Sequence, residues 1–251
     1  MRIALGSAQF GLDYGVANSS GQLKIAETKK ILKRASILGI DSIDTAVDYG
    51  NSEASIGEIG VKNFNIITKL PIIPPNTKNV PSWINNQVEN SLQRLNQNEI
   101  FGLLLHRPMQ LLEKNGEKIF DTLKSLKVNR IVKNIGISIY SPSELDALAN
   151  KFDFDIIQAP FNLVDNRLAD SGWLRKLSSR GIEIHTRSAF LQGLLLMEKR
   201  NLPPFFDNWS NLFNVWHKWL EKNDSKALDV CLSYILDKSE IDKVIVGVDS
   251  V

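Results

Sequence analysis

Eight short apolar segments alternate with helical patterns along this chain, and no other feature of the sequence restricts the possible folds as strongly. The segments recur at a spacing of roughly thirty residues, which is typical of parallel βαβ units. Eight such units predict a single (β/α)8 barrel, a TIM barrel, rather than an open doubly wound sheet. The predicted strands are Arg2–Leu5, Ser42–Asp44, Asn65–Lys69, Ile100–Leu105, Lys133–Ser138, Ile156–Ala159, Ile182–Thr186 and Lys243–Gly247.

Apolar residues at helical spacing fill the intervals between these strands. Residues Leu194–Asp224 interrupt the alternation as an insertion, with a loop at Pro203–Phe206 and a helix at Trp216–Leu220. No linker rich in Gly or Ser divides the chain, so we expect one barrel domain over residues 1–251, with the final barrel helix absent from the sequence. The other predicted helices are Ile25–Leu38, Ser52–Ile59, Pro81–Leu95, Lys114–Leu126, Arg167–Arg180 and Lys226–Leu236, with a further helix start capped near Ser141.

Composition excludes several classes of partner. The chain has 251 residues, 43% of them hydrophobic, and a formal net charge of +2 with Lys and Arg scattered, so we expect no nucleic-acid partner. No apolar run is long enough to span a membrane, and Gly6 interrupts the N-terminus too early for a signal peptide, so we expect a cytoplasmic protein. The single cysteine, Cys231, lies in an apolar helical pattern and is predicted to be a core thiol.

Ionisable side chains close or follow three successive strands. Asp44 ends the second strand and Tyr49 follows it, Lys69 ends the third, and His106 follows the fourth. In a parallel barrel all such strand ends gather on one face, where barrel enzymes keep their active sites. We therefore expect these four side chains to lie close together at the mouth of the barrel.

These residue types suit the polarisation of a carbonyl group. A neighbouring ammonium such as Lys69 stabilises a phenolate, so we expect it to lower the pKa of Tyr49 and make this phenol a usable proton donor. Asp44 would keep the lysine charged, and His106 could donate a hydrogen bond to a carbonyl oxygen. Together they provide what hydride delivery to the carbonyl carbon requires.

Each residue also has a structural alternative. Asp44 could cap a turn, Tyr49 could be a surface aromatic, Lys69 a solvated strand end and His106 a hydrogen-bonded structural residue. Three scattered histidines and the absence of suitably spaced carboxylates give no metal site. His185, at the end of the seventh strand, could face the site, whereas His217 is expected to be structural.

The segment Asp44–Gly50, DTAVDYG, with the following Asn51-Ser52-Glu53 and Ile56-Gly57, resembles the signature of the aldo-keto reductases. Lys69 after NIIT and His106 in LLLHRP fall where that family keeps its lysine and histidine. The resemblance implies a catalytic tetrad of Asp44, Tyr49, Lys69 and His106, with Tyr49 as the general acid and base. It also implies NADPH or NADH held without a Rossmann fold, and hydride transfer to a small aldehyde or ketone, sugar-derived carbonyls included.

The same resemblance, which runs from Ile3 to Gly247, implies a set of cofactor contacts. Ser138 and Gln158 would hold the carboxamide, although ordinary strand-end hydrogen bonding is the alternative, and Ile139 stands where the family usually has Asn. Arg187 stands where an aromatic residue commonly stacks on the nicotinamide. The segment that reads the 2′-phosphate would follow Val251, so the resemblance does not choose between NADPH and NADH. The implied cofactor residues are Gly6, Ser7, Ala8, Ser138, Gln158, Arg187, Ser188, Leu191, Gln192 and Gly193.

Other functions stay open. Within the family, the reaction could run as oxidation of a sugar or alcohol. Some members act as channel subunits, so a nucleotide-binding barrel that works as a redox sensor or regulatory subunit is the alternative from another class. The aromatic residues of the insertion could form an apolar wall over the site, a packed loop or an interface patch; they are Phe205, Phe206, Trp209, Phe213 and Trp216.

Overall fold

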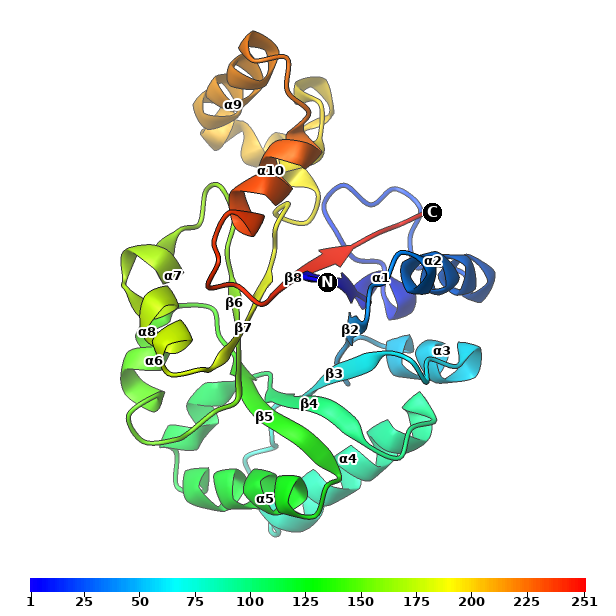
Figure 1. The fold of residues 1–251 in the computed structure, drawn as a ribbon, viewed down its shortest axis with the longest axis vertical. Coiled ribbons are helices and arrows are strands. Elements are labelled where there is room, and N and C mark those ends of the chain that lie inside the picture. The colour runs from blue at the N-terminus through cyan, green and yellow to red at the C-terminus, as the bar shows by residue number, and fades with distance from the viewer.

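The structure, a computed structural model, describes residues 1–251 and contains a closed barrel of eight parallel strands, shown in Figure 1. Strand β1 pairs with both β2 and β8, and the pairing of Gly6 with Asp44 and with Gly247 closes the barrel at its mouth. The predicted (β/α)8 fold is confirmed, with each strand end within one residue of its predicted position. The strands are β1 Ile3–Gly6, β2 Ser42–Asp44, β3 Asn65–Leu70, β4 Ile100–Leu105, β5 Val132–Ser138, β6 Ile156–Pro160, β7 Glu183–Arg187 and β8 Lys243–Gly247.

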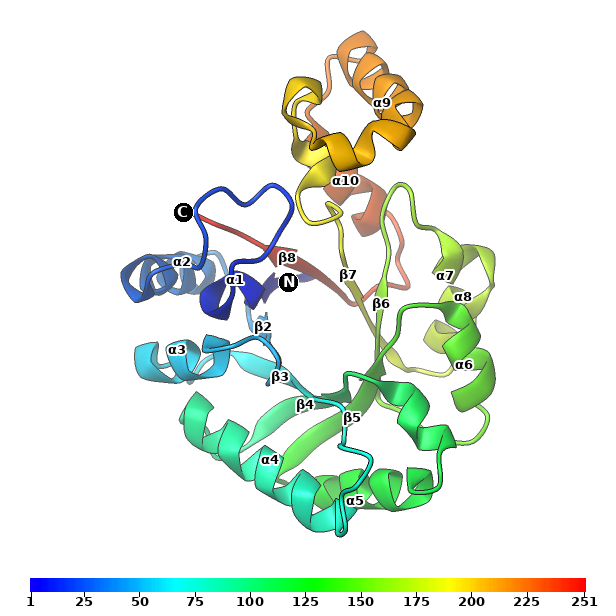
Figure 2. The same cartoon turned by 180° about the vertical axis from the view of Figure 1, so that it is seen from behind.

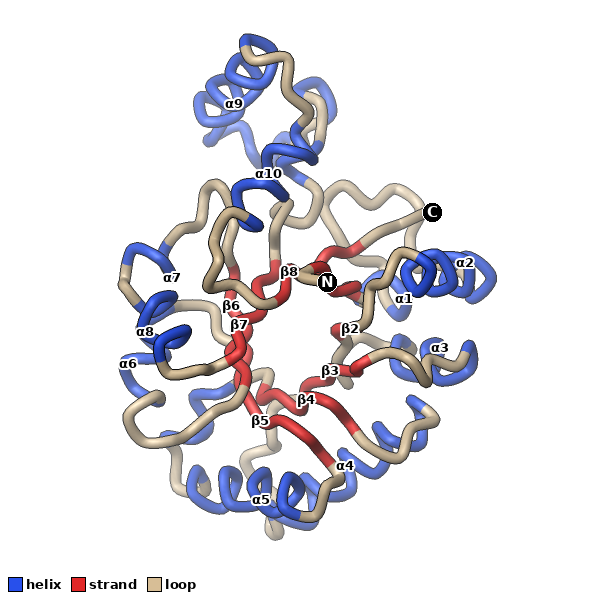
Figure 3. The backbone as a smooth tube through the Cα atoms, in the orientation of Figure 1, coloured by secondary structure: helices blue, strands red, loops and turns tan.

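Helices surround the strands on most sides of the barrel, as the tube in Figure 3 shows. None of them combines the length and the apolar composition that crossing a bilayer would need. Short 3-10 helices lie at Pro108–Leu112, Leu194–Leu196, Lys199–Asn201 and Pro204–Trp209. The α-helices are α1 Ala8–Gly11, α2 Ile25–Ile37, α3 Ser52–Ile59, α4 Val80–Leu95, α5 Gly116–Val128, α6 Pro142–Leu148, α7 Arg167–Asp170, α8 Trp173–Ser179, α9 Ser210–Lys222 and α10 Ala227–Leu236.

Two helices differ from the pattern in the sequence. The predicted helix Arg167–Arg180 is two helices, α7 and α8, because Gly172 between them has a left-handed φ of 79°. The short helix α1 was not predicted. It packs so closely on the loop after β2 that a Cβ on Gly11 would lie 1.8 Å from the carbonyl oxygen of Tyr49, so only glycine fits there.

The core lies between the strands and the helices, with a smaller cluster inside the barrel. The outer cluster contains 34 buried residues and joins β3–β8 to α4, α5, α6, α8 and α10. Inside the barrel, Ile67, Leu104 and Ile156 form a separate apolar cluster. Because both faces of the strands are buried, their sequences are nearly continuous apolar runs, and polar residues are concentrated at their ends.

Residues 194–224 project away from the barrel as a separate lobe, seen from both sides in Figures 1 and 2. The lobe is anchored by a cluster of Leu194, Leu195, Phe213 and Cys231. The helix in this insertion is longer than predicted, and the predicted loop at Pro203–Phe206 forms a 3-10 helix. Cys231 is buried, as predicted for a core thiol, and burial raises the pKa of its thiol to about 11.

Candidate active site

The strand ends after β2, β3 and β4 place the four predicted residues together at the mouth of the barrel. The loop after β2 runs along β3, because the N–H of Thr45 donates to Ile67 and that of Val47 donates to Lys69. This course brings the ring of Tyr49 over the end of β3, with its centroid 5.0 Å from Lys69 Nζ. The ring of His106 lies edge-on to that of Tyr49, with 6.1 Å between the centroids.

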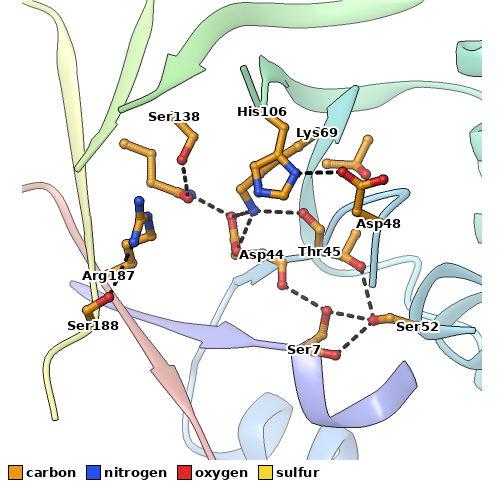
Figure 4. Close-up of polar contacts among 12 residues, drawn as sticks. Ser7, Asp44, Thr45, Asp48, Ser52, Lys69, His106, Ser138, Arg187 and Ser188 are labelled. Carbon is orange, nitrogen blue, oxygen red and sulfur yellow. Dashed lines mark hydrogen bonds and ion pairs between the residues drawn. The ribbon is translucent and has the colours of Figure 1, made fainter. Parts of the chain in front are cut away.

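Lys69 and Asp44 form a buried ion pair, shown in Figure 4. Lys69 is fully buried, and its Nζ lies 2.8 Å from Asp44 Oδ1, 2.7 Å from Oδ2 and 2.8 Å from the carbonyl oxygen of Thr45. These contacts orient the ammonium toward Asp44 and Thr45. Burial lowers the pKa of Lys69, and the charge of Asp44 and its hydrogen bond oppose that effect.

The expectation of a lowered pKa for Tyr49 is wrong. Burial, followed by the negative charge of Asp44, raises the pKa of Tyr49 well above its ordinary value, and Arg187 is the first group that opposes them. The ammonium of Lys69 donates to Asp44 and Thr45, and no hydrogen bond joins it to the phenol. Tyr49 therefore carries its proton at neutral pH, which is the form that a proton donor needs.

His106 has a partner that the sequence did not indicate. Its Nδ1 lies 3.1 Å from Oδ2 of Asp48, the residue directly before Tyr49. A carboxylate can only accept, so Nδ1 carries a proton, and in a neutral ring Nε2 is then an acceptor. Burial and the charge of Lys69 lower the pKa of His106, while Asp48 raises it. The ring can therefore donate from Nε2 only as the imidazolium.

Ser138 and Gln158 lie beneath the mouth and hold Asp44. The hydroxyl of Ser138 donates to Gln158 Oε1 at 3.2 Å, and Gln158 Nε2 donates to Asp44 Oδ1 at 2.6 Å. Both side chains are fully buried, and neither lines the cavity at the mouth. This is the strand-end hydrogen bonding that the sequence left open as the alternative to a carboxamide contact.

A cavity of about 500 Å³ opens beside this cluster, between the loops after β1, β7 and β8. Asp44 and Tyr49 border it, and its size is typical of small-molecule and cofactor sites. Ser7 borders it as well, but its hydroxyl donates to the carbonyl oxygen of Asp44 at 2.8 Å and is fully buried. Of the predicted cofactor residues, the cavity is lined by Gly6, Ser7, Ala8, Arg187, Ser188, Gln192 and Gly193. Leu191 is not among them, because its side chain packs in the apolar cluster around Phe213.

The loop after β7 presents free backbone donors to this cavity. Ser188, Leu191, Gln192 and Gly193 all have left-handed φ values, from 48° to 87°. The N–H groups of Ala189, Phe190, Gln192 and Gly193 donate to no acceptor in the protein, and all four of these residues line the cavity. Successive free N–H groups in such a loop form a concave site for an anion, so the loop fits a phosphate or pyrophosphate group.

The loop after β1 closes against the loop after β7. The N–H of Ala17 donates to the carbonyl oxygen of Gln192 at 3.2 Å. A Cβ on Gly193 would lie 2.5 Å from the Cβ of Ala17, so glycine is required for this approach. Tyr14, on the same loop, also lines the cavity, and burial raises its pKa.

Arg187 extends from the end of β7 toward the loop after β5. Its guanidinium lies 4.4 Å from the ring centroid of Tyr140 and donates to the carbonyl oxygen of Ile139 at 3.0 Å. A second nitrogen donates to Ser188 Oγ at 3.3 Å. The aromatic partner of this arginine within the protein is thus Tyr140, a residue that the sequence analysis did not select.

Two other expectations concern residues near the mouth. His185 lies inside the barrel with Nε2 2.9 Å from Glu183 Oε1, and it does not reach the cavity. The aromatic residues of the insertion do not wall the cavity; only Leu196 and Met197 of that segment line it, and Phe205 is 75% exposed on the lobe. Phe206, Phe213 and Trp216 pack within the lobe.

Known proteins share both sequence and fold with this chain. A sequence model described as "Aldo/keto reductase family" matches residues 2–251. "Aldo-keto reductase YhdN" of Bacillus subtilis (strain 168) is 30% identical over 148 residues, which cover 53% of this chain and 43% of the relative. "Uncharacterized oxidoreductase YtbE" of the same organism is 29% identical over 179 residues, covering 68% of this chain and 61% of the relative. The chain thus spans about half the length of the curated relatives it matches.

Solved structures with low sequence identity have the same fold. The holo form of aldo-keto reductase AKR11C1 from Bacillus halodurans superimposes with a TM-score of 0.78 at 18% identity, covering 99% of this chain and 82% of that one. The glycerol dehydrogenase AKR11B4 from Gluconobacter oxydans gives a TM-score of 0.73 at 22% identity, covering 99% and 83%. At these identities the likeness concerns the fold alone.

Proposed function

This chain belongs to the aldo/keto reductase family, and we propose that it is an NAD(P)H-dependent reductase of aldehydes or ketones in which Tyr49 donates the proton. The observation that carries the proposal is the arrangement of Tyr49 at one end of a cavity, beside a buried Lys69–Asp44 ion pair and the His106 ring. A protonated phenol that borders the cavity, with a fixed cation and an imidazole next to the phenol, provides the groups that carbonyl reduction requires.

The cavity suits a dinucleotide on chemical grounds. The free N–H groups of residues 189, 190, 192 and 193 would bind the pyrophosphate, and Gly6 and Gly247 leave room on the opposite wall, where a Cβ on Gly247 would lie 2.4 Å from Gln9 Nε2. When bound, NADPH or NADH supplies the hydride that adds to the carbonyl carbon. The pocket and its donors support such a ligand, and the family relationship agrees with it.

Tyr49 and Lys69 divide the work at the carbonyl oxygen. As negative charge develops on that oxygen, the phenol of Tyr49 transfers its proton to it and becomes a phenolate. Lys69, 5.0 Å from the centroid of that ring, then stabilises the phenolate electrostatically, and Asp44 keeps the ammonium in place. The raised pKa of Tyr49 keeps the phenol protonated until the carbonyl oxygen gains charge.

His106 assists as a hydrogen-bond donor in its charged form. With Nδ1 bonded to Asp48, the imidazolium donates from Nε2 to the carbonyl oxygen. Burial lowers the pKa of His106, so the imidazolium forms only as the pH falls below neutrality. We therefore expect reduction to be faster under mildly acidic conditions.

The decisive test replaces Tyr49 by Phe, which removes the hydroxyl and keeps the ring. We expect nicotinamide fluorescence titrations to give nearly unchanged NADPH or NADH affinity, while kcat/KM over a panel of aldehydes falls by about a thousandfold. A fully active Tyr49→Phe variant would refute the role of Tyr49. Cofactor binding by the wild type without turnover of any aldehyde or ketone would instead favour a redox sensor or regulatory subunit.

A further inference from the structure

Two arginines lie close to the ring of Tyr140 at the barrel mouth. The Cζ of Arg187, at the end of β7, is 4.4 Å from the ring centroid, and the Cζ of Arg107, in the segment after β4, is 5.5 Å from it. Tyr140 itself follows β5 and is 48% exposed. Three strand ends thus bring two guanidinium groups to one aromatic ring, a contact that holds arginine in place without neutralising it.

Neither arginine has a carboxylate partner. Arg187 donates only to the oxygens of Ile139 and Ser188, which leaves three of its five N–H donors free, and Arg107 donates to no acceptor in the protein. Arg167 also reaches this position, donating to the carbonyl oxygen of Tyr140, but its guanidinium forms an ion pair with Asp165 at 2.7 Å. The charges of Arg107 and Arg187 are therefore unbalanced.

The carboxylates nearest in the fold are already bonded. Glu144 accepts the backbone N–H groups of Tyr140 and Ser141 at 2.7 and 2.9 Å, as part of the cap of α6. Asp48 bonds to His106, and Asp44 is paired with Lys69. Each of these carboxylates is already hydrogen-bonded, and none of them forms an ion pair with Arg107 or Arg187.

The pair of arginines lies beside the reacting groups. Arg187 lines the same cavity as Tyr49, and Arg107 directly follows His106 in the chain. The positive charge of Arg187 is also the first influence that opposes the raised pKa of Tyr49, so its field reaches the phenol. An anion bound by these guanidinium groups would lie within a small molecule's length of the carbonyl that is reduced.

We propose that Arg107 and Arg187, held against Tyr140, bind an anionic group of the substrate, so that this enzyme prefers aldehydes or ketones that carry a carboxylate or a phosphate. Guanidinium groups donate two parallel N–H bonds to either anion, and such charge-assisted bonds are among the stronger ones in proteins. This inference rests on the proposed carbonyl reduction and specifies its substrate class. Neutral aldehydes would gain no contact from the two arginines.

The first test compares matched substrates with the wild-type protein. One pair is benzaldehyde and 4-carboxybenzaldehyde, and the other is glyceraldehyde and glyceraldehyde 3-phosphate. We expect kcat/KM for the anionic member to exceed that for the neutral member at least about tenfold, with the preference shrinking in about 0.5 M salt. A preference in only one pair identifies that anion as the ligand, and no preference in either pair overturns the inference.

Variants then locate the preference. In Arg107→Gln and in Arg187→Gln we expect the anionic-to-neutral ratio of kcat/KM to fall about tenfold or more, chiefly through a higher KM for the anion. Arg107→Lys should retain part of the anionic-to-neutral ratio, because lysine keeps the positive charge but cannot donate two parallel N–H bonds from a planar group. Arg175→Gln is the matched control: Arg175 is exposed on α8 and forms no ion pair, so its loss should leave the ratio unchanged.

The outcomes separate this inference from the proposed function. If the wild type reduces neutral and anionic aldehydes with equal kcat/KM, the proposed reductase activity is supported and the anion site is refuted. If it reduces none, calorimetric titration with 4-carboxybenzyl alcohol decides: binding that Arg107→Gln weakens tenfold supports the site, and absence of binding overturns it. An unchanged ratio in both arginine variants also contradicts the assignment.

Discussion

Thr68 and Lys69 are neighbours on β3, yet they contact two different ion pairs on opposite faces of the barrel wall. Inside, Lys69 binds both oxygens of Asp44. Outside, the hydroxyl of Thr68 donates at 2.6 Å to Glu53 of α3, which also receives Arg94 of α4 at 2.6 Å. The alternation of side chains along one strand therefore separates two sites of similar chemistry.

The two ion pairs, Glu53–Arg94 and Asp44–Lys69, differ in what surrounds them. Glu53 is 1% exposed and accepts from Thr68, Ser91 and Arg94, so it ties α3 to β3 and α4, and it does not line the cavity at the mouth. Asp44, in contrast, borders the cavity together with Tyr49. We therefore expect the outer pair to be structural and the inner pair, which adjoins a cavity and a titratable group, to be functional.

The largest effect is expected from Lys69→Met. It removes the cation that stabilises the phenolate and leaves Asp44 buried without a counter-charge, so kcat/KM should fall by about a thousandfold and stability by about 3–5 kcal/mol. Adding Asp44→Asn should restore much of the stability, measured by urea denaturation, but none of the rate, measured by cofactor oxidation. Recovery of activity in the double variant would show that the inner pair is only structural.

Glu53→Gln tests the outer pair in the same way. The substitution keeps the shape and removes the charge, and because Arg94 is 36% exposed and can be hydrated, we expect a loss of about 2–3 kcal/mol in the free energy of unfolding. Below the unfolding transition, kcat/KM should stay within about threefold of the wild type. The double variant Glu53→Gln/Arg94→Gln serves as the charge-neutral control; a large loss of rate in it would contradict the division between the two pairs.

Asp48→Asn examines the group that supports His106. Asp48 raises the pKa of His106 against burial and Lys69, so its neutralisation lowers that pKa further and reduces the imidazolium fraction. The fall of kcat/KM with rising pH should move to lower pH, and the rate near neutrality should drop about threefold to tenfold. Profiles of kcat/KM recorded from about pH 5 to pH 8 check this. If the profile does not move, the fall of kcat/KM with rising pH is due to another group.

Thr68→Val is expected to have the smallest effect. It removes one hydrogen bond to the buried Glu53 carboxylate, at a cost of about 1.5 kcal/mol, and leaves the inner face of β3 unchanged. Thermal denaturation measures the loss, and an unchanged pH profile shows that the mouth is unaffected. If the rate falls as much as in Asp48→Asn, the two faces of β3 are coupled rather than separate.

The residues that meet at the mouth were predictable because strand ends are fixed by hydrophobic pattern. Asp44, Lys69 and His106 close or follow apolar runs, and parallel strands bring such ends to one edge. The partners of these residues were not predictable. Asp48 reaches His106 across 58 positions in the sequence, and Gln158 reaches Asp44 across 114, so no local pattern marks either contact.

The sequence by itself determined the eight-stranded barrel, the order of its elements and the four ionisable groups at its mouth, since these follow from periodicity and local composition. Only the tertiary structure decided which donors and acceptors meet. It paired Lys69 with Asp44 and Thr45, turned Leu191 out of the cavity and set Arg187 against Tyr140. Protonation and binding depend on distances between chain segments far apart in sequence, and these distances exist only after the barrel has closed.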